Sequence, residues 1–217
     1  MKSNVNDNGK THRFRLELIL VTEKKLNVGA SALSPKIKAD VPLIHLPGEK
    51  CLIPGSTIKG ILRTSLIRLL NTLGEKTPPT VHPSSLSDSN DMVCMIFGRP
   101  GKPGKIFVYG AILERDSCPI THVKIDDDTR TVAEGALYTV EYLPIGTEFT
   151  CRIEGELTID ELEYLLLSIL EARYERIGKS GLVSFWIDKK RSELPVEESE
   201  LIKEIVEVIG IERRESL

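Results

Sequence analysis

A short run of residues that begins at Ile53, I-P-G-S-T-I-K-G-I-L-R, combines residue types that suit a phosphate group. Gly55 and Ser56 stand directly before an apolar stretch with helical spacing, and with the preceding proline they predict the start and the N-cap of a helix. The first N–H groups of a helix have no partner inside it, and together with the helix dipole they favour an anion. The run therefore predicts an anion site at a helix N-terminus.

Three residues inside this predicted helix, Lys59, Gly60 and Arg63, strengthen that hypothesis. Lys59 and Arg63 are four residues apart, so they share a helix face. Gly60 costs about 1 kcal/mol relative to alanine in a helix interior, which makes sense where another backbone must come close. Phosphate binding accounts for all three residues, and a capped core helix with a solvated basic face is the alternative interpretation.

Asp40 is the second candidate for chemistry. It is the only acidic residue between Glu23 and Glu49, in a segment rich in glycine, proline, serine and lysine. A single carboxylate beside bound phosphates can hold Mg²⁺ or Mn²⁺, or it can orient a ribose hydroxyl. A surface turn before Val41 and Pro42 is the alternative interpretation.

Gly178, Lys179 and Ser180 suggest a nucleotide-binding loop, but the residues around them exclude one. The nucleoside-triphosphate motif requires a glycine where this chain has Arg173, and it precedes a helix instead of following one. A short glycine turn at this position can still bring a lysine to a phosphate.

Other catalytic patterns are weak. No serine–histidine–acid set is recognisable, and His45 and His122 are candidates for acid–base groups, although lone histidines are more often bystanders. No two cysteines form a C-x-x-C pair and the histidines are scattered, so we expect neither a zinc site nor a disulfide framework. The cysteines are Cys51, Cys94, Cys118 and Cys151.

Hydrophobic periodicity predicts the elements that must position these residues. Alternating or continuous apolar runs predict strands, and apolar residues three and four apart predict helices. The predicted elements are a strand at 14–22, a helix at 56–73, strands at 105–113 and 148–153, a helix at 159–176 capped by Thr158 or Asp160, a strand at 182–187 and a helix at 197–209. This β-α-β-β-α-β order predicts an α+β, ferredoxin-like (RRM-like) fold with a C-terminal helix.

The length of 217 residues fits one domain that carries insertions. We expect a flexible N-terminus at 1–13 and a single domain at 14–217. The insertions fall at about 23–52, 75–104 and 116–146, where proline, glycine, serine and charged residues interrupt the periodic segments.

Charge is distributed unevenly along the chain. Residues 1–76 carry 13 lysines and arginines against 6 acidic residues, whereas 111–171 carry 4 against 14 and 192–217 carry 3 against 8. The first third is therefore the candidate surface for an anionic partner, and uneven surface charge without a partner is the alternative. No apolar run approaches the roughly 18 residues of a membrane helix, and the N-terminus lacks an apolar signal core, so we expect a cytoplasmic protein with no membrane contact.

Four motifs, in order along the chain, resemble those of the RAMP superfamily of CRISPR-associated proteins. The first is the I-P-G-S-T-I-K-G-I-L-R run, and the second is I-F-G from Ile96, which is similar to a short F-G turn of the family. The third combines V-K-I-D-D-D-T from Val123, G-A-L from Gly135 and E-Y-L-P-I-G-T-E-F from Glu141, and it resembles the backbone (Csm/Cmr-type) subunit of type III effector complexes. The fourth, G-K-S-G from Gly178, resembles a shortened glycine-rich loop.

The resemblance implies a subunit that stacks head-to-tail with copies of itself or paralogues along a CRISPR guide RNA, beside other type III subunits. It implies a β-hairpin thumb at about 116–143 that interrupts guide–target pairing. It also implies metal-dependent cleavage of target RNA by an aspartate that precedes an x-Pro pair, as Asp40 does. The implied metal is Mg²⁺ or Mn²⁺ at Asp40, and the implied RNA-binding residues are Gly55, Ser56, Lys59, Gly60, Arg63, Lys124, Lys179 and Ser180.

Two other functions stay open on the sequence alone. A backbone subunit can hold guide RNA without cutting, because type III systems contain related paralogues that do not all cleave. A metal-independent nuclease of the same superfamily, which processes guide precursors, would favour a histidine base such as His45. Those nucleases usually pair two ferredoxin-like domains, whereas the predicted elements of this chain fill one.

Overall fold

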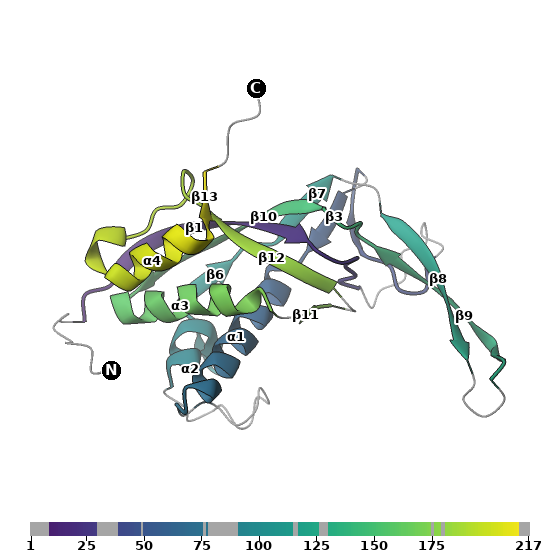
Figure 1. The fold of residues 1–217 in the computed structure, drawn as a ribbon, viewed down its shortest axis with the longest axis horizontal. Helices are drawn as coiled ribbons and strands as arrows, with labels where there is room; N and C mark the ends of the chain where they lie inside the picture. Colours follow the sequence, from purple (N-terminus) through teal and green to yellow (C-terminus); the bar gives the residue numbers. More distant parts are fainter. Residues whose placement is uncertain are drawn as a thin grey trace.

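A central antiparallel sheet organises the chain in the computed structural model, which describes residues 9–29, 39–48, 50–75, 77, 91–114, 117–125, 130–174, 176–178 and 181–212. The sheet contains β1 (His12–Thr22), β6 (Ile106–Val108), β10 (Glu148–Leu157) and β12 (Gly181–Asp188), in the order β12-β1-β10-β6 (Figure 1). Each neighbouring pair of these strands is antiparallel. Two short strands extend the sheet at β12, namely β11 (Arg176–Ile177) and β13 (Gly210–Ile211).

The strands at the centre of the sheet form because their side chains alternate between a buried and an open face. Along β1, Leu16, Leu18 and Leu20 are fully buried, whereas Arg13 and Arg15 are exposed. A strand has a side-chain period of two, so one face of the sheet joins the core and the other carries charged residues. β1 pairs with β10 along almost its whole length, which makes these two strands the rigid base of the domain.

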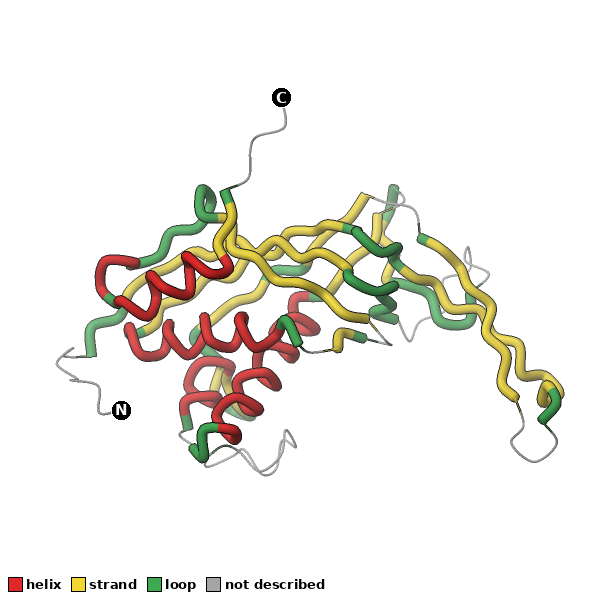
Figure 2. Tube along the Cα trace, in the orientation of Figure 1, coloured by secondary structure: helices red, strands yellow, loops and turns green. Residues whose placement is uncertain are grey.

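Helices cover one face of the sheet (Figure 2). α1 (Gly55–Thr72) follows the segment after β1, α3 (Ile159–Ala172) connects β10 to the β11–β12 region, and the two helices pack against each other. The short η2 (Val196–Glu198) leads into α4 (Glu200–Ile209), which packs against α3 and β12. The leucines and isoleucines on the inner faces of these helices join the buried cluster of the sheet and form one continuous core.

The ends of the two connecting helices differ in how they are capped. Thr158 caps α3, because its hydroxyl accepts from the Glu161 N–H while the Glu161 carboxylate accepts from the Thr158 N–H. α1 begins at Gly55 with Pro54 in the N-cap position, and no side chain caps it. The predicted side-chain cap is therefore wrong, since proline offers no acceptor there and Ser56 already lies inside the first turn.

The predicted strand at 105–113 is two strands in two different sheets. β6 ends at Val108, and β7 (Ala111–Glu114) pairs instead with β3 (Lys50–Ile53), which in turn pairs with β2 (Ile44–Leu46). Gly110 lies at the break, where a Cβ atom would come within 2.9 Å of the Leu52 side chain. Part of the predicted loop at 23–52 thus forms a small sheet of its own.

Two further elements occupy a segment that the sequence assigned to an insertion. α2 (Met92–Phe97) is capped by the Asp91 side chain, and the short hairpin of β4 (Gly98–Arg99) and β5 (Lys102–Pro103) follows it directly. Gly98 has a φ of 86°, and a Cβ atom there would lie 2.4 Å from the Gly104 nitrogen. The predicted F-G turn is therefore the tight junction between α2 and this hairpin.

A long antiparallel hairpin, here called the thumb, consists of β8 (Cys118–Ile125) and β9 (Val132–Tyr142). It extends away from the sheet and the helices (Figure 1). Its position matches the hairpin predicted at about 116–143, so that structural prediction is confirmed.

The core elements follow the order β1-α1-β6-β10-α3-β12, which is the β-α-β-β-α-β order of a ferredoxin-like fold. The predicted α+β fold class is thereby confirmed, with α4 as the C-terminal helix. Among the residues that the structure describes, no helix combines the length and the apolar character needed to cross a membrane.

Candidate nucleic-acid interface

The uncapped start of α1 offers backbone donors to a ligand. Pro54 makes no side-chain hydrogen bond to the first turn, and its carbonyl oxygen accepts from Thr57 N at 3.0 Å and Ile58 N at 3.4 Å. Ser56 is exposed at this end of the helix. The Thr57 and Ile58 N–H groups are thus already engaged. No described side chain caps the N–H groups of Gly55 and Ser56, and since Gly55 is buried, exposed Ser56 is the position where this helix start could meet an anion.

The two glycines of this helix start serve different purposes. Gly55 is buried, and a Cβ atom there would lie 2.0 Å from the Val108 carbonyl oxygen, so the close packing of α1 on β6 requires glycine. Gly60 is exposed, and a Cβ atom there would meet no described atom within 4 Å. The fold therefore explains Gly55, whereas Gly60 leaves open space that an external group can occupy.

A groove of about 550 Å³ lies between α1, the β4–β5 hairpin and β6, and we call it the basic groove. Lys59 and Arg63 line it from α1, and Arg99 and Lys102 line it from the β4–β5 hairpin. Phe107 of β6 forms part of the same wall. Two elements that are distant in sequence thus bring four cationic side chains together.

The cations of α1 in the basic groove are not neutralised by the protein. Within the described part of the chain, neither Lys59 nor Arg63 forms an ion pair, whereas Arg15, Lys105 and other surface bases do. Lys59 Nζ donates to the Ile106 carbonyl oxygen at 3.1 Å, and burial followed by the charge of Arg63 lowers the pKa of Lys59. A bound anion would stabilise both cations, because it would offset their mutual repulsion.

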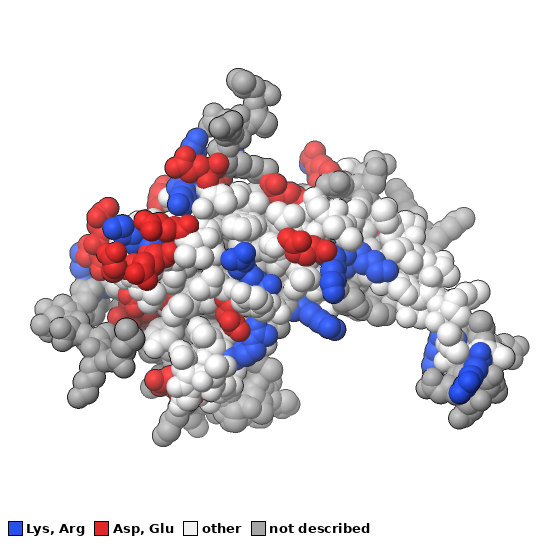
Figure 3. Space-filling model, viewed as in Figure 1, with Lys and Arg blue, Asp and Glu red and all other residues white. Residues whose placement is uncertain are grey.

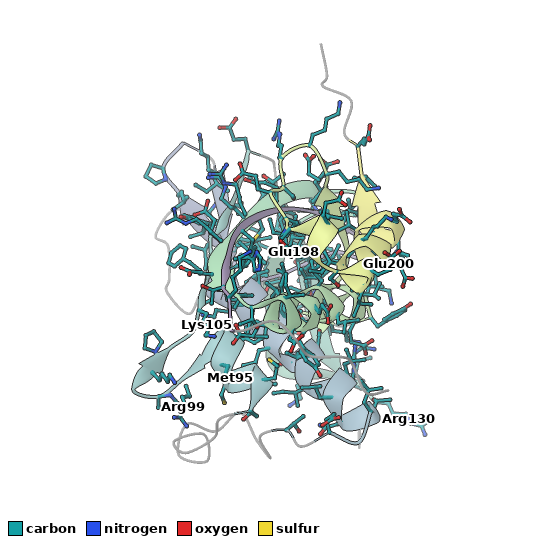
Figure 4. All side chains as sticks on the ribbon, turned by 90° about the vertical axis from the view of Figure 1, so that its left-hand side faces the viewer. Met95, Arg99, Lys105, Arg130, Glu198 and Glu200 are labelled. Carbon is teal, nitrogen blue, oxygen red and sulfur yellow. The ribbon has the colours of Figure 1, made fainter. Side chains whose placement is uncertain are left out.

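The acidic surface of the protein lies elsewhere. Acidic side chains gather at the α4 end of the molecule (Figure 3), where the exposed residues include Glu197, Glu198, Glu200, Glu204 and Glu207. In the end-on view, Arg99 lies on the side of the β4–β5 hairpin, away from Glu198 and Glu200 (Figure 4). The charge asymmetry of the sequence is thus also an asymmetry in space.

Asp40 lies at the base of the thumb, where its exposed carboxylate is tied to β9. Its backbone N–H donates to the Thr139 carbonyl oxygen at 2.9 Å, and its Oδ2 accepts from Thr139 N at 2.6 Å. The next residue, Val41, forms a parallel bridge to Val140. Asp40 is not among the described residues that line the basic groove, so the two predicted functional sites occupy separate parts of the surface.

The described residues around Asp40 do not make up a metal site by themselves. The described residues contain no group of three His, Cys, Asp or Glu side chains that could hold a metal ion. The hydrogen bond to Thr139 engages Oδ2 of Asp40, and within the described part of the chain no hydrogen bond engages Oδ1. Mg²⁺ commonly binds one or two carboxylates and completes its shell with water and substrate phosphates. Among the described residues, Asp40 thus offers one carboxylate, which fits a cation that also binds RNA phosphates and water.

The glycine-rich segment packs against the chain that leads to Asp40. Gly178 has a φ of 55°, and a Cβ atom there would lie 2.0 Å from the Asn27 carbonyl oxygen. Asn27 is buried, and its Nδ2 donates to the Glu141 carbonyl oxygen in β9 at 2.6 Å. The glycine turn and the base of the thumb are therefore joined through Asn27. The predicted RNA contacts Lys179 and Ser180 lie outside the described residues.

The thumb presents apolar side chains to solvent. Val123, Ile125 and Leu137 are 47%, 61% and 65% exposed, and Val123 lies opposite Leu137 across the hairpin. Lys124, a predicted RNA contact, is also exposed on β8. Apolar side chains on a projecting element are the type that proteins insert between stacked bases.

His45 belongs to a buried network instead of an open catalytic site. Its Nε2 lies 2.7 Å from Oε2 of Glu141, and its Nδ1 lies 3.9 Å from the sulfur of Cys51. Glu141 is 4% exposed and also accepts from Leu43 N and from the Ser117 hydroxyl. Burial by itself raises the pKa of Glu141, but the hydrogen bonds from Ser117, His45 and Leu43 lower it overall. The network fastens β2 to the base of β9.

His122 has a similar structural setting on the thumb. Its ring stacks on Tyr138 with 5.3 Å between centroids, and its Nε2 shares a hydrogen bond of 3.0 Å with the Tyr142 hydroxyl. Lys25 lies over the Tyr142 ring at 4.9 Å. His122 therefore joins the two strands of the thumb, and the contact of Lys25 with Tyr142 links the thumb to the body. The four cysteines are free, and Cys118 alone among them is exposed.

Sequence reasoning found half of the basic groove and missed the rest. Lys59 and Arg63 follow from helical spacing, but Arg99, Lys102 and Phe107 were not singled out. The run R-P-G-K-P-G that starts at Arg99 is a strong turn signal with two cations, and it could have indicated a basic hairpin. Its proximity to α1 depends on the fold and has no signal in the sequence.

A comparison with family profiles matches residues 6–183 to the RAMP superfamily. A comparison with curated proteins finds no match. The fold and the groove define a ferredoxin-like protein with a surface suited to nucleic acid. Because the profile covers most of the chain, the protein belongs to the RAMP superfamily of CRISPR-associated proteins, and this membership supports a role in RNA binding.

Proposed function

We propose that this chain is a backbone subunit of a type III CRISPR effector complex, which binds guide RNA in antiviral defence. The observation that carries the proposal is the basic groove, which Lys59 and Arg63 of α1 line together with Arg99 and Lys102 of the β4–β5 hairpin. Cationic side chains and free N–H groups bind the phosphate backbone without regard to base sequence. A subunit that must accept any guide sequence needs this kind of contact.

In this proposal the thumb acts on the duplex between guide and target. The exposed apolar residues of β8 and β9 would insert between bases and displace a nucleotide of the target strand. Asp40 is hydrogen-bonded to β9 at the base of the same hairpin, so a displaced nucleotide would have its phosphate near this carboxylate. The thumb and Asp40 thus form a second site, separate from the guide-binding groove.

The chemistry proposed at Asp40 uses a nucleophile that belongs to the RNA. The 2′-oxygen beside the scissile phosphate attacks phosphorus, the bond from phosphorus to the 5′-oxygen breaks, and the products are a 2′,3′-cyclic phosphate and a 5′-hydroxyl. Asp40 would orient the hydroxyl or help hold a Mg²⁺ or Mn²⁺ ion. The ion, when bound, would offset negative charge on the reacting phosphate. The thumb would supply in-line geometry by turning the nucleotide out of the helix.

We also propose that copies of this chain, or paralogues, associate head-to-tail on the guide. Acidic side chains gather at α4 (Figure 3), and Arg99 of the basic groove lies away from Glu198 and Glu200 (Figure 4), so one copy can present acid to a basic region of the next. Such a contact joins unlike surfaces and therefore produces a helical array unless a ring closes it. Other type III subunits would bind at the ends of the array.

The groove is tested by RNA binding to the purified chain. A variant with Lys59→Gln and Arg63→Gln should lose at least about tenfold in affinity for a single-stranded RNA of any sequence, because two charge-assisted contacts disappear. A matched variant with Lys50→Gln and Lys203→Gln removes two lysines that pair with glutamates outside the groove. This control should bind nearly as wild type. Equal losses in both variants would contradict a specific groove.

Cleavage is tested separately in a reconstituted complex with labelled target RNA and Mg²⁺ or Mn²⁺. Asp40→Asn keeps an oxygen that can accept from Thr139 N but removes the charge, so the thumb base stays intact. Cleavage should fall by about 10²-fold or more while target binding persists. Glu114→Gln, which changes an exposed acid on β7 that pairs with Lys50, is the control.

The outcome of that assay separates the candidate functions. Unchanged cleavage by the Asp40→Asn complex would contradict the catalytic role. A wild-type complex that binds tightly and never cuts would favour the non-catalytic backbone subunit. Cleavage of guide precursor in the presence of EDTA would favour the metal-independent nuclease, although His45 as a base would first have to leave its network with buried Glu141.

A further inference from the structure

An exposed aromatic pair lies beside the basic groove. Phe107 of β6 is 62% exposed and Tyr109 directly after the strand is 41% exposed. Their ring centroids are 4.7 Å apart at an interplanar angle of 75°, an edge-to-face contact. Phe107 extends from the open face of an edge strand, so the core does not explain its size or its apolar character.

We propose that Phe107 is a stacking platform for the base of an unpaired RNA nucleotide, and that the phosphates of the same strand lie in the basic groove. The inference rests on the proposed function, because it assumes that the groove holds RNA. It adds a contact to a base, whereas the proposed function needs only contacts to the backbone. Every base has a flat π-face, so such stacking tolerates any sequence.

The position of Phe107 relative to the cations supports this assignment. Lys59 Nζ donates to the carbonyl oxygen of Ile106, the residue directly before Phe107, and both Lys59 and Phe107 line the basic groove. Phe107 also lines a second groove of about 590 Å³, to which Arg13 and Arg15 contribute. Glu154, Glu156 and Glu193 line that second groove too, and Arg15 pairs with Glu154 and Glu193. Lys59 and Arg63, which form no ion pair within the described part of the chain, therefore place the phosphates on the side of the basic groove, with the Phe107 ring at its edge.

The neighbouring tyrosine holds the platform in place. The Tyr109 hydroxyl donates to Oε2 of Glu154 at 3.0 Å, and the guanidinium of Arg152 lies 5.9 Å from the centre of the tyrosine ring. The edge-to-face contact then restricts the Phe107 ring before any ligand binds. A preorganised ring loses little side-chain entropy on stacking, which increases its contribution to affinity.

The test compares two oligonucleotides of about 10 units that carry equal charge. One is single-stranded oligouridylate, and the other is the same chain with abasic ribose at every position. The wild-type protein should bind the first more tightly by about 5- to 100-fold, as expected for one stacked base. Phe107→Ala should lose this difference and bind both chains equally, while Phe107→Trp should retain it. Leu73→Ala, which removes another exposed apolar side chain at the far end of α1, should behave as wild type.

A spectroscopic measurement gives an independent readout. Trp186 is the only tryptophan of the chain, so Phe107→Trp in a Trp186→Phe background places a single indole at the platform. Its fluorescence should be quenched by oligouridylate and not by the abasic chain. In a second outcome, the charge variant of Lys59 and Arg63 weakens oligouridylate binding while neither Phe107→Ala nor the removal of the bases changes the affinity. That result overturns the stacking inference and leaves the proposed function standing. If the charge variants Lys59→Gln and Arg63→Gln have no effect, both are overturned.

Discussion

The same substitution at two positions of α1 should have opposite effects on stability. Gly60→Ala places a methyl group where no described atom lies within 4 Å, and it relieves the cost of glycine in the interior of an 18-residue helix. That cost is about 0.8–1 kcal/mol, so the variant should unfold at a Tm about 2–4 °C higher than wild type. Gly55→Ala places its methyl 2.0 Å from the Val108 carbonyl oxygen, and the resulting overpacking should cost about 1–3 kcal/mol.

Chemical denaturation followed by circular dichroism measures the free energy of unfolding of each variant. The affinity of Gly60→Ala for RNA is measured as well. We expect Gly60→Ala to be more stable than wild type yet weaker in RNA affinity, because its methyl occupies space that the RNA backbone would approach. A variant with higher stability and unchanged RNA affinity would place the RNA elsewhere. Lower stability would refute the structural reasoning, since it would mean that the space at Gly60 is already filled.

Three further predictions concern charge and assembly. The affinity for RNA should fall at high pH, where Lys59 loses its proton. Because burial and the charge of Arg63 lower the pKa of Lys59, the fall should begin below the pH expected for an ordinary lysine, the pKa of which is about 10.4. In a titration of Kd against pH, Lys59→Arg should abolish this fall, since arginine stays charged. The pKa of Glu141 is lower in the folded protein than in the unfolded chain, where it is about 4.3, so ionised Glu141 stabilises the fold above that pH. This stabilisation should vanish as the pH drops through the pKa of the folded protein. Glu141→Gln should cost about 1–3 kcal/mol at neutral pH and weaken the dependence of the unfolding free energy on pH in the acid range. Light scattering should show particles that grow with RNA length, whereas a fixed closed dimer would contradict head-to-tail association.

The sequence predicted those parts of the fold that depend on local pattern. β1, β10 and α3 begin close to where alternation, helical spacing and the Thr158 capping signal placed them. The predicted ends of β10 and α3 are wrong: β10 continues to Leu157, and α3 stops at Ala172, so Arg176 lies in β11 and not in the helix. The break between β6 and β7 was missed, because the apolar pattern continues across Tyr109 and Gly110 without a strong turn signal. The break occurs because β7 pairs with β3, and pairing with a strand that is distant in sequence gives no signal in the local sequence.

In the candidate sites, too, only those contacts between residues close in sequence were predictable. Helix periodicity places Lys59 and Arg63 on one face, so their proximity was predictable from their spacing. Phe107 joins them only because α1 packs on β6, and Lys59 meets the Ile106 carbonyl 47 residues further along the chain. Asp40 was selected for its isolation, but its partner Thr139 is 99 residues away and lies in the thumb. Contacts of this kind depend on tertiary packing.

The central claim, that the basic groove binds the RNA backbone, is tested most directly by the salt dependence of affinity. Each phosphate neutralised on a single strand contributes about 0.7 to the slope of log K against log salt. If the four cations Lys59, Arg63, Arg99 and Lys102 each meet one phosphate, the wild-type slope should be about −2.8 from the groove, and the variant with Lys59→Gln and Arg63→Gln should fall to about −1.4. The same slope for wild type and variant would contradict the account.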